Sequence, residues 1–333
     1  MPRHNPRMPT RRTVFGAASF CLGLRSARAE APVVRLGILQ FGSVQWVADV
    51  IRREGIDRFH GFVLETVTLA NTDAGRVSLM AGASDIVVSD WPFVAVQRAA
   101  GTKLCFSPFS SASGGIMTGA RSVIRGLADL RGRRLGVAGG PVDKSWLIVQ
   151  AAGRAQGVDL GGDAGVVYGA PPLLGAKLRQ GELDAVLTYW NFAAELAAAG
   201  FRQVVSVSQC AAELGIPPHS SLVGFVFHQD WATANRPAID GFLAAVDDAE
   251  GVLGRSDEAW RAVRPLMNAD SDALFAGLRD RFREGIPRTD INAEEKAAEA
   301  MFAVLHRTGG SRATGGIDAL PPGIFWPPGH AAN

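Results

Sequence analysis

Residues 33–55 read VVRLGILQFGSVQWVADVIRREG, and this stretch decides the fold of the chain. Its first seven residues form a short apolar run that is β-branched at its start, which predicts a buried strand. A turn follows at 40–43, and residues 44–55 then carry Val44, Val47, Val50 and Ile51 at helical spacing. A strand, a tight turn and a helix in this order are the opening unit of a parallel α/β sheet.

The same unit recurs along the chain. Further strands of a first series are predicted at 62–69, 85–88 and 103–109, with helices between them. A second series predicts strands at 135–138, 164–168, 185–188 and 204–207, and helices at 145–156, 172–180 and 191–199. A strand at 222–228 has no neighbour of its own in the second series, so we expect it to return to the first sheet. The region 237–306 is predicted to be helical.

This rhythm predicts an α/β protein with two doubly wound domains. Domain I is expected to be discontinuous, over 30–116 and 220–333, and domain II over 117–219. The tail from Gly309 is rich in glycine and proline and ends in Phe325 and Trp326. We expect this tail to dock loosely, with its aromatic side chains against the surface of domain I.

The first 29 residues differ from the rest. Four arginines without an acidic residue precede the apolar run 14–24, and Ala27-Arg28-Ala29 offers a cleavage site. This layout predicts a signal peptide that is cleaved after Ala29, and hence export to the periplasm. The pair Arg11-Arg12 resembles a twin-arginine signal, and both twin-arginine and Sec export stay open. An N-terminal surface helix is the alternative.

Removal of residues 1–29 changes the charge of the chain. It takes away six arginines and no acid, which leaves 28 Lys and Arg against 32 Asp and Glu, a net charge of −4. An acidic mature chain does not favour nucleic-acid binding. No later apolar run approaches the roughly 18–20 residues that span a bilayer. Cys105 and Cys210 remain, without a C-x-x-C or a His/Cys cluster, so we expect no metal and no cofactor.

Three stretches carry a family resemblance. They are MAGASDI at 80–86, GLADLRGRRLGV at 126–137 and AKLRQGELDA at 176–185. In this order and spacing they resemble the periplasmic solute-binding proteins of ABC transporters, in the nitrate/sulfonate/taurine (SsuA/THI5-like) branch. The resemblance implies a type II-like periplasmic binding protein fold with a ligand cleft between the domains. It also implies a monomer that hands a small molecule to an ABC permease and its ATPase.

Ligands of such sheets bind beyond the carboxyl ends of the strands, where helix N-termini offer unpaired N–H groups. The loops predicted at that edge supply the candidate ligand-binding residues. These are Phe41, Gly42, Ser43, Ser89, Asp90, Trp91, Ser113, Gly140, Asp143, Lys144, Ser145, Tyr189, Trp190 and Asn191.

Several of these residues have two possible roles. Trp91 and Trp190 directly follow strand ends and are either ligand walls or core, whereas Trp46 and Trp146 are expected in the core. Lys144 either pairs with a ligand anion or is solvated. Ser43 and Ser145 are either helix caps, ligand contacts or both.

Asp90 bears on the class of ligand. Its carboxylate would repel an anion unless Lys144 or an arginine neutralises it, and it would otherwise accept a hydrogen bond from an amine or a ring N–H. The ligand classes that remain open are a sulfonate-like anion, a zwitterion and a pyrimidine-like heterocycle.

No catalytic residue is predicted. The sequence has no G-x-S-x-G, no P-loop and no H-E-x-x-H, and the histidines after the signal fall outside the predicted edge loops. A periplasmic ligand sensor for a signalling partner, and an enzyme on the same fold, are the alternatives to a transport receptor.

Overall fold

The computed structural model describes residues 1–2, 31–40, 42–217 and 220–327. The chain divides into two units, 1–30 and 31–333. The signal-peptide prediction and Phe41 lie outside the described residues. Within the described part, no helix is long and apolar enough to span a membrane.

The first sheet has the strand order β2-β1-β3-β10-β4. Its strands are β1 (Val33–Leu39), β2 (Val63–Leu69), β3 (Ile86–Asp90), β4 (Leu104–Ser110) and β10 (Val223–His228). The helices between them are α1 (Val44–Arg53), α2 (Ile56–Phe59), α3 (Thr72–Met80) and α4 (Trp91–Ala99). β1 pairs in parallel with β2 and β3, whereas β10 runs antiparallel between β3 and β4. The strand predicted at 222–228 does return to the first sheet.

The second sheet has the order β7-β6-β8-β5-β9. Its strands are β5 (Gly115–Thr118), β6 (Arg134–Ala138), β7 (Gly165–Gly169), β8 (Ala185–Thr188) and β9 (Arg202–Ser206). Its helical segments are η1 (Leu127–Leu130), α5 (Lys144–Ala155), α6 (Leu160–Asp163), α7 (Pro171–Arg179), α8 (Trp190–Ala198) and α9 (Val207–Glu213). The short strand β5, which the sequence pattern did not predict, runs antiparallel to β8 and β9. The predicted α/β fold with two doubly wound sheets is confirmed.

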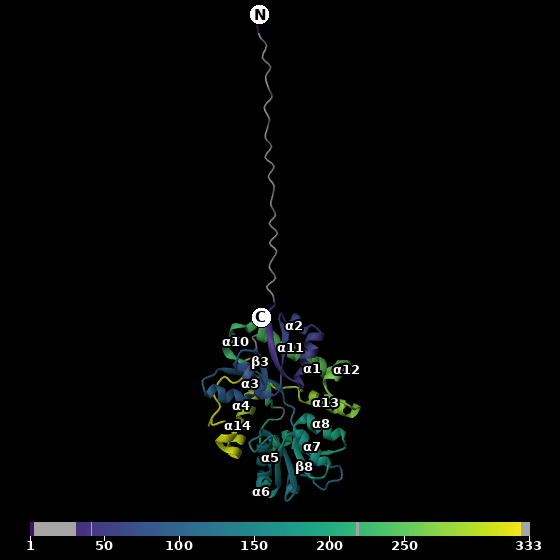
Figure 1. The fold of residues 1–333 in the computed structure, drawn as a ribbon. Helices are drawn as coiled ribbons and strands as arrows, with labels where there is room; N and C mark the ends of the chain where they lie inside the picture. Colours follow the sequence, from purple (N-terminus) through teal and green to yellow (C-terminus); the bar gives the residue numbers. More distant parts are fainter. Residues whose placement is uncertain (3–30, 41, 218–219, 328–333) are drawn as a thin grey trace. The chain divides into compact units, whose positions relative to one another are not determined.

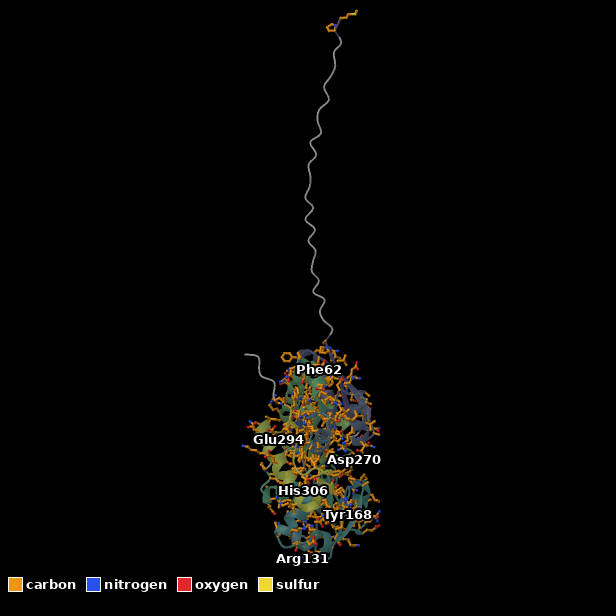
Figure 2. The ribbon with its side chains drawn as sticks, turned by 90° about the vertical axis from the view of Figure 1, so that its left-hand side faces the viewer. Phe62, Arg131, Tyr168, Asp270, Glu294 and His306 are labelled. Atoms are coloured by element: carbon orange, nitrogen blue, oxygen red, sulfur yellow. The ribbon has the colours of Figure 1, made fainter. Side chains whose placement is uncertain are left out.

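Two segments connect the sheets. The chain leaves the first sheet through 111–114 and returns through 214–222. A side chain at Gly114 would place its Cβ 1.8 Å from the Thr188 carbonyl oxygen, so only glycine fits the close approach of the first crossing to β8. The return crossing is held by the buried Glu294, which accepts hydrogen bonds from the Ser221 backbone N–H (2.9 Å) and hydroxyl (3.0 Å). Figure 2 labels Glu294 and, further along the same helix, His306.

The helices after β10 contact both sheet layers. They are α10 (Gln229–Ala234), α11 (Arg236–Arg255), α12 (Asp257–Val263), η2 (Arg264–Leu266), α13 (Asp272–Glu284) and α14 (Ile291–Ala313). α11 packs on α1 beside the first sheet, whereas α13 packs on α8 and α14 on α5 (Figure 1). One apolar core therefore runs from α4 through α14 to α5.

The C-terminal tail is part of the first sheet's core. The Phe106 N–H donates to the Ile324 carbonyl (2.7 Å) and the Trp326 N–H donates to the Phe106 carbonyl (2.8 Å). Phe325 packs edge-to-face on Phe106 with ring centroids 5.4 Å apart. Phe325 and Trp326 are only 6% and 7% exposed. The aromatic side chains contact the first sheet, as expected. The expectation of loose docking was wrong up to residue 327, because the tail covers the open edge of β4 and buries these rings.

Candidate ligand-binding site

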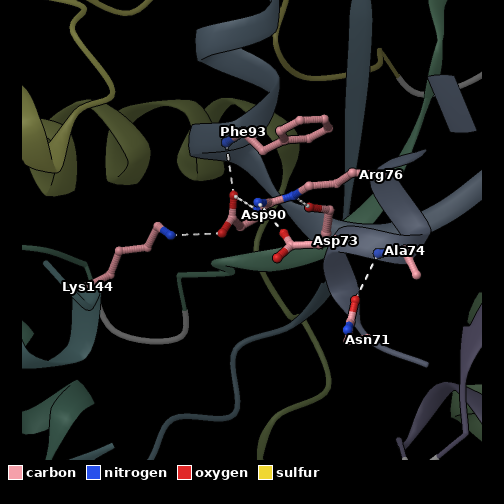
Figure 3. Close-up of polar contacts among 8 residues, drawn as sticks. Asn71, Asp73, Ala74, Arg76, Asp90, Phe93 and Lys144 are labelled. Carbon is pink, nitrogen blue, oxygen red and sulfur yellow. Dashed lines mark hydrogen bonds and ion pairs between the residues drawn. The ribbon is translucent and has the colours of Figure 1, made fainter. Parts of the chain in front are cut away.

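An ion pair joins the carboxyl ends of the two sheets. Asp90 is the last residue of β3, and Lys144 is the first residue of α5, which follows β6. The Lys144 Nζ lies 2.9 Å from the Asp90 Oδ2 (Figure 3). The loops that the strand-end rule selects separately in each sheet thus meet in space.

Asp90 has partners on both of its carboxylate oxygens. Its Oδ1 accepts the Phe93 N–H (2.9 Å), which caps the N-terminus of α4. The same oxygen lies 3.5 Å from a guanidinium nitrogen of Arg76 on α3. The Arg76 Nε donates to the Ser89 hydroxyl (3.2 Å), and the guanidinium lies over the Phe93 ring (Figure 3). Asp90 is therefore neutralised by Lys144 and by an arginine, as the anion reading of the sequence requires.

We name Arg76, Asp90 and Lys144 the strand-end charge cluster. Their side chains are 30%, 16% and 28% exposed, and their formal charges sum to +1. Arg76 was not predicted, because it lies inside a helix pattern, five residues after the polar turn that follows β2. The signal that would have found it is its position in the first turns of α3, at the same sheet edge as the other loops. That helix is capped by Asn71, whose side chain accepts the Ala74 N–H (2.8 Å).

A second acid at this edge is also satisfied internally. Asp143 caps α5 by accepting the Trp146 N–H (3.2 Å), and its other oxygen accepts a hydrogen bond from the Tyr189 hydroxyl (3.4 Å). Burial raises the pKa of Asp143. Burial and the nearby Asp143 carboxylate raise the pKa of Tyr189 to about 12, so Tyr189 is a neutral phenol at physiological pH. Gly139 leaves room for this contact, since a Cβ there would lie 2.9 Å from the Asp143 carboxylate.

The predicted serines behave differently from one another. Ser43 occupies the N-cap position of α1, but its side chain makes no capping hydrogen bond. Ser145 is the second residue of α5, where Asp143 supplies the cap. The Ser113 hydroxyl accepts the Ser208 N–H (3.2 Å) at the start of α9. The prediction that the side chains of Ser43 and Ser145 cap helices was therefore wrong. The half-buried Gly42, Gly140 and Asn191 lie at the same strand ends.

The tryptophans at the strand ends divide into core and edge. Trp91 is 1% exposed and lines a small pocket with Phe302 and Leu305 of α14. Its ring packs in the core, so Trp91 takes the core role that the sequence left open and does not form a wall for a ligand. Trp190 is half-buried and packs edge-to-face on Trp46, with ring centroids 6.2 Å apart. This aromatic pair joins α1 to α8 and is a second contact between the two strand-end edges.

Trp146 is a core residue, as expected. It is fully buried in α5, and its indole N–H donates to the Tyr168 hydroxyl (3.2 Å) at the end of β7. Figure 2 labels Tyr168.

A hollow larger than the one beside Trp91 lies elsewhere in the described part of the chain. It has a volume of about 420 Å³ and is lined by residues such as Arg121, Leu178 and Phe201. Arg133 and Asp184, which directly precede β6 and β8, also line it, so it lies at the edge where these strands begin. That edge lacks the helix N-termini that follow parallel strands, and we place the candidate site at the opposite edge.

The chemistry offered at the strand ends is that of binding. It consists of the cations Arg76 and Lys144, the acids Asp90 and Asp143, hydroxyl groups and the N-termini of α1, α4, α5 and α8. Cys105 and Cys210 are both buried and free, and burial raises their pKa values to about 11 and about 12. Neither cysteine is thus a thiolate at neutral pH. Among the described residues, no group of three or more His, Cys, Asp or Glu side chains is arranged to hold a metal ion.

Comparison with known proteins identifies the family. The NMT1/THI5-like family model matches residues 60–253, more than half of the chain. The chain belongs to the NMT1/THI5-like family. A comparison with curated protein sequences gave no match.

Solved structures share the fold of this NMT1/THI5-like chain at low sequence identity. The periplasmic aliphatic sulphonate-binding protein SsuA from Escherichia coli superposes with a TM-score of 0.71 at 18% identity, over 89% of this chain and 92% of that one. The alkanesulfonate-binding protein SsuA from Xanthomonas axonopodis pv. citri, bound to MOPS, gives 0.65 at 17% identity, over 89% and 97%. The desulfurization enzyme DSZB gives 0.55 at 17% identity, over 88% and 97%.

Proposed function

We propose that this chain is the substrate-binding component of an ABC importer and that it captures a small organic anion between the strand ends of its two sheets. The observation that carries the proposal is the Lys144–Asp90 ion pair, with Arg76 beside it, at the meeting point of the two sheets. The membership of the NMT1/THI5-like family supports the same function.

An anion fits the site better than a zwitterion. Asp90 and Asp143 each accept a backbone N–H at a helix cap and a second side-chain donor, so neither carboxylate offers both oxygens to a ligand ammonium group. Lys144 has donors left beyond its single bond to Asp90, and these can bind an anionic group of a ligand. The sulfonate-binding proteins of similar fold support the sulfonate-like member of the three ligand classes.

Domain closure is the proposed mechanism. Residues 30–116 with 220–333, and residues 117–219, would move as two domains about the crossings 111–114 and 214–222. The Lys144–Asp90 and Trp46–Trp190 contacts belong to the closed form, and a ligand bound between the domains would stabilise it. The closed form would then dock on a membrane permease driven by its ATPase, in the periplasm, after cleavage at Ala29.

A thermal-shift panel tests the proposal on residues 30–333, which contain the compact unit 31–333. The probes are ethanesulfonate, the zwitterion taurine and an aminopyrimidine. A ligand at 100 times its Kd adds about 2.7 kcal/mol to stability, which raises Tm by a few degrees. We expect ethanesulfonate to give this shift. A well-folded sample that no organic anion stabilises would refute the proposal, and a response to taurine or the aminopyrimidine alone would refute the ligand class.

Charge-removing variants localise the binding. Lys144→Gln and Arg76→Gln should each weaken ethanesulfonate binding about tenfold, the size expected for one half-buried charge. Lys296→Gln, on the exposed surface of α14, is the matched control and should bind like the wild type. Equal affinities in all three variants would place the site elsewhere.

An enzymatic function on this fold is the alternative, and the similarity to the desulfurization enzyme DSZB supports it. The buried, protonated thiols of Cys105 and Cys210 do not support a cysteine nucleophile. A turnover assay separates the two functions: a receptor returns its ligand unchanged, and consumption of ethanesulfonate by the purified chain would favour the enzyme.

A further inference from the structure

We infer that Asp90 is a selectivity residue, and that its carboxylate lowers the affinity of the site for an anion in proportion to the charge of that anion. The inference rests on the proposed function and adds a selectivity residue to it. Asp90 places one negative charge in direct contact with both cations of the strand-end charge cluster, and a ligand anion bound by these cations would be repelled by it.

The charge of Asp90 is fixed in place. Its Oδ1 is held by the Phe93 N–H (2.9 Å) and its Oδ2 by the Lys144 ammonium (2.9 Å), so rotation of the carboxylate would break a helix cap as well as an ion pair. At 16% exposure, the carboxylate is screened much less than a surface acid.

The helix cap does not require this charge. Asparagine caps helices about as well as aspartate does, since both offer a side-chain oxygen to the N2 or N3 N–H. An asparagine at position 90 would keep the bond to Phe93 N–H and leave Lys144 and Arg76 without their shared counter-charge. The functional consequence of the carboxylate, as distinct from the cap, is therefore electrostatic.

The nearby acids do not replace Asp90. Asp73 lies 3.4 Å from the other guanidinium nitrogen of Arg76, but its side chain is 86% exposed, so water screens it strongly. Asp143 accepts its hydrogen bonds from the Trp146 N–H and the Tyr189 hydroxyl, and its charge acts on Lys144 equally in the wild type and in Asp90→Asn. Asp90 is the carboxylate that touches both Lys144 and Arg76 (Figure 3).

The effect of removing the charge scales with the charge of the ligand. A unit charge roughly 6 Å away in a medium of effective dielectric about 40 changes affinity about tenfold for each ligand charge. Asp90→Asn should therefore tighten a monoanion about tenfold and a dianion about a hundredfold. The ratio of the two Kd values should shift about tenfold towards the dianion.

Isothermal titration calorimetry with ethanesulfonate and ethane-1,2-disulfonate tests the inference. We expect the ratio of the two Kd values to shift about tenfold towards the disulfonate in Asp90→Asn relative to the wild type. Asp73→Asn is the matched control, because it removes a carboxylate from the same arginine at an exposed position, and its ratio should stay within about twofold of wild type. Melting curves show whether Asp90→Asn has kept the helix cap.

The outcomes separate the two proposals. If the wild type binds ethanesulfonate but Asp90→Asn leaves the Kd ratio unchanged, the role of Asp90 is overturned and the proposed function is kept. The same conclusion follows if Asp73→Asn shifts the ratio as much as Asp90→Asn does. Failure of the wild type and of Asp90→Asn to bind either sulfonate overturns the proposed sulfonate-like ligand class and this inference together. Asp90→Ser tests the same ratio if Asp90→Asn does not fold, since serine also offers a capping oxygen and carries no charge.

Discussion

Replacement of Phe325 by alanine tests whether the C-terminal tail is part of the folded core. Phe325 is 6% exposed, packs on Phe106 and lies between two backbone hydrogen bonds that join the tail to β4. Burial of one phenylalanine ring against other aromatic and aliphatic side chains stabilises a fold by several kcal/mol. The tail therefore contributes to stability far more than a loosely attached terminus would.

The magnitude follows from the burial. Core Phe→Ala substitutions cost about 3–5 kcal/mol, and the lower end applies here because the site is at a sheet edge where neighbouring chain can relax into the space. We expect Phe325→Ala to lower the free energy of unfolding by about 3 kcal/mol. At roughly 2 °C per kcal/mol for a chain of this size, Tm should fall by about 6 °C.

Urea unfolding followed by circular dichroism measures this change, and Phe59→Ala is the matched control. Phe59 is 82% exposed, so the same substitution there should change the free energy by less than about 0.5 kcal/mol. If Phe325→Ala lost less than about 1 kcal/mol, and so resembled the control, the tail would not be docked on β4 in solution.

Two further predictions concern buried titratable groups. Burial raises the pKa values of Cys105 and Cys210 to about 11 and about 12. Both thiols should therefore resist alkylation by iodoacetamide in the native protein at pH 8 and react fully once urea unfolds it. Rapid labelling of the native protein would show that these thiols are not buried. Burial, with a smaller effect of Asp247, raises the pKa of Glu250 from 4.5 to about 8. Between these values the folded state holds a proton that the unfolded state has lost, so stability should fall as pH rises from 5 to 8. In Glu250→Gln, the free energy of unfolding should differ between pH 5 and pH 8 by a few kcal/mol less than in the wild type. Urea titrations at both pH values measure this difference, and a difference equal to that of the wild type would count against the raised pKa.

The elements of the fold were largely predictable because their signals are local. The apolar runs at 33–39 and 185–188 coincide with β1 and β8, and the isolated run at 222–228 is a strand of the first sheet. β5 and α9 were missed. β5 has four residues and begins at Gly115, and its partners are supplied by two distant strands, so neither length nor periodicity distinguishes it from a loop.

The positions of the strand-end residues were predictable, but the directions of their side chains were not. The strand-end rule selects Asp90, Asp143 and Lys144 because it depends only on where strands end. It says nothing about where a ring points, and Trp91 turns into a core that α14 completes some 200 residues later in the chain. Arg76 was missed for a related reason, since a long side chain on α3 reaches the end of a neighbouring strand.

The energetics of the contact between the sheets explain why charge and stability are separable at this site. The two sheets are held together mainly by apolar packing, in which Trp91, Leu147 and Leu305 belong to one continuous core. Each such side chain contributes roughly 1.5–3 kcal/mol when buried. A partly exposed ion pair such as Lys144–Asp90 contributes only about 0–1 kcal/mol, because the ions lose hydration when they pair. Substitution of Asp90 should therefore leave the packing of the two sheets almost unchanged. Its main effect should be on ligand affinity, because the charges of Lys144 and Arg76 would then lack the carboxylate that they share.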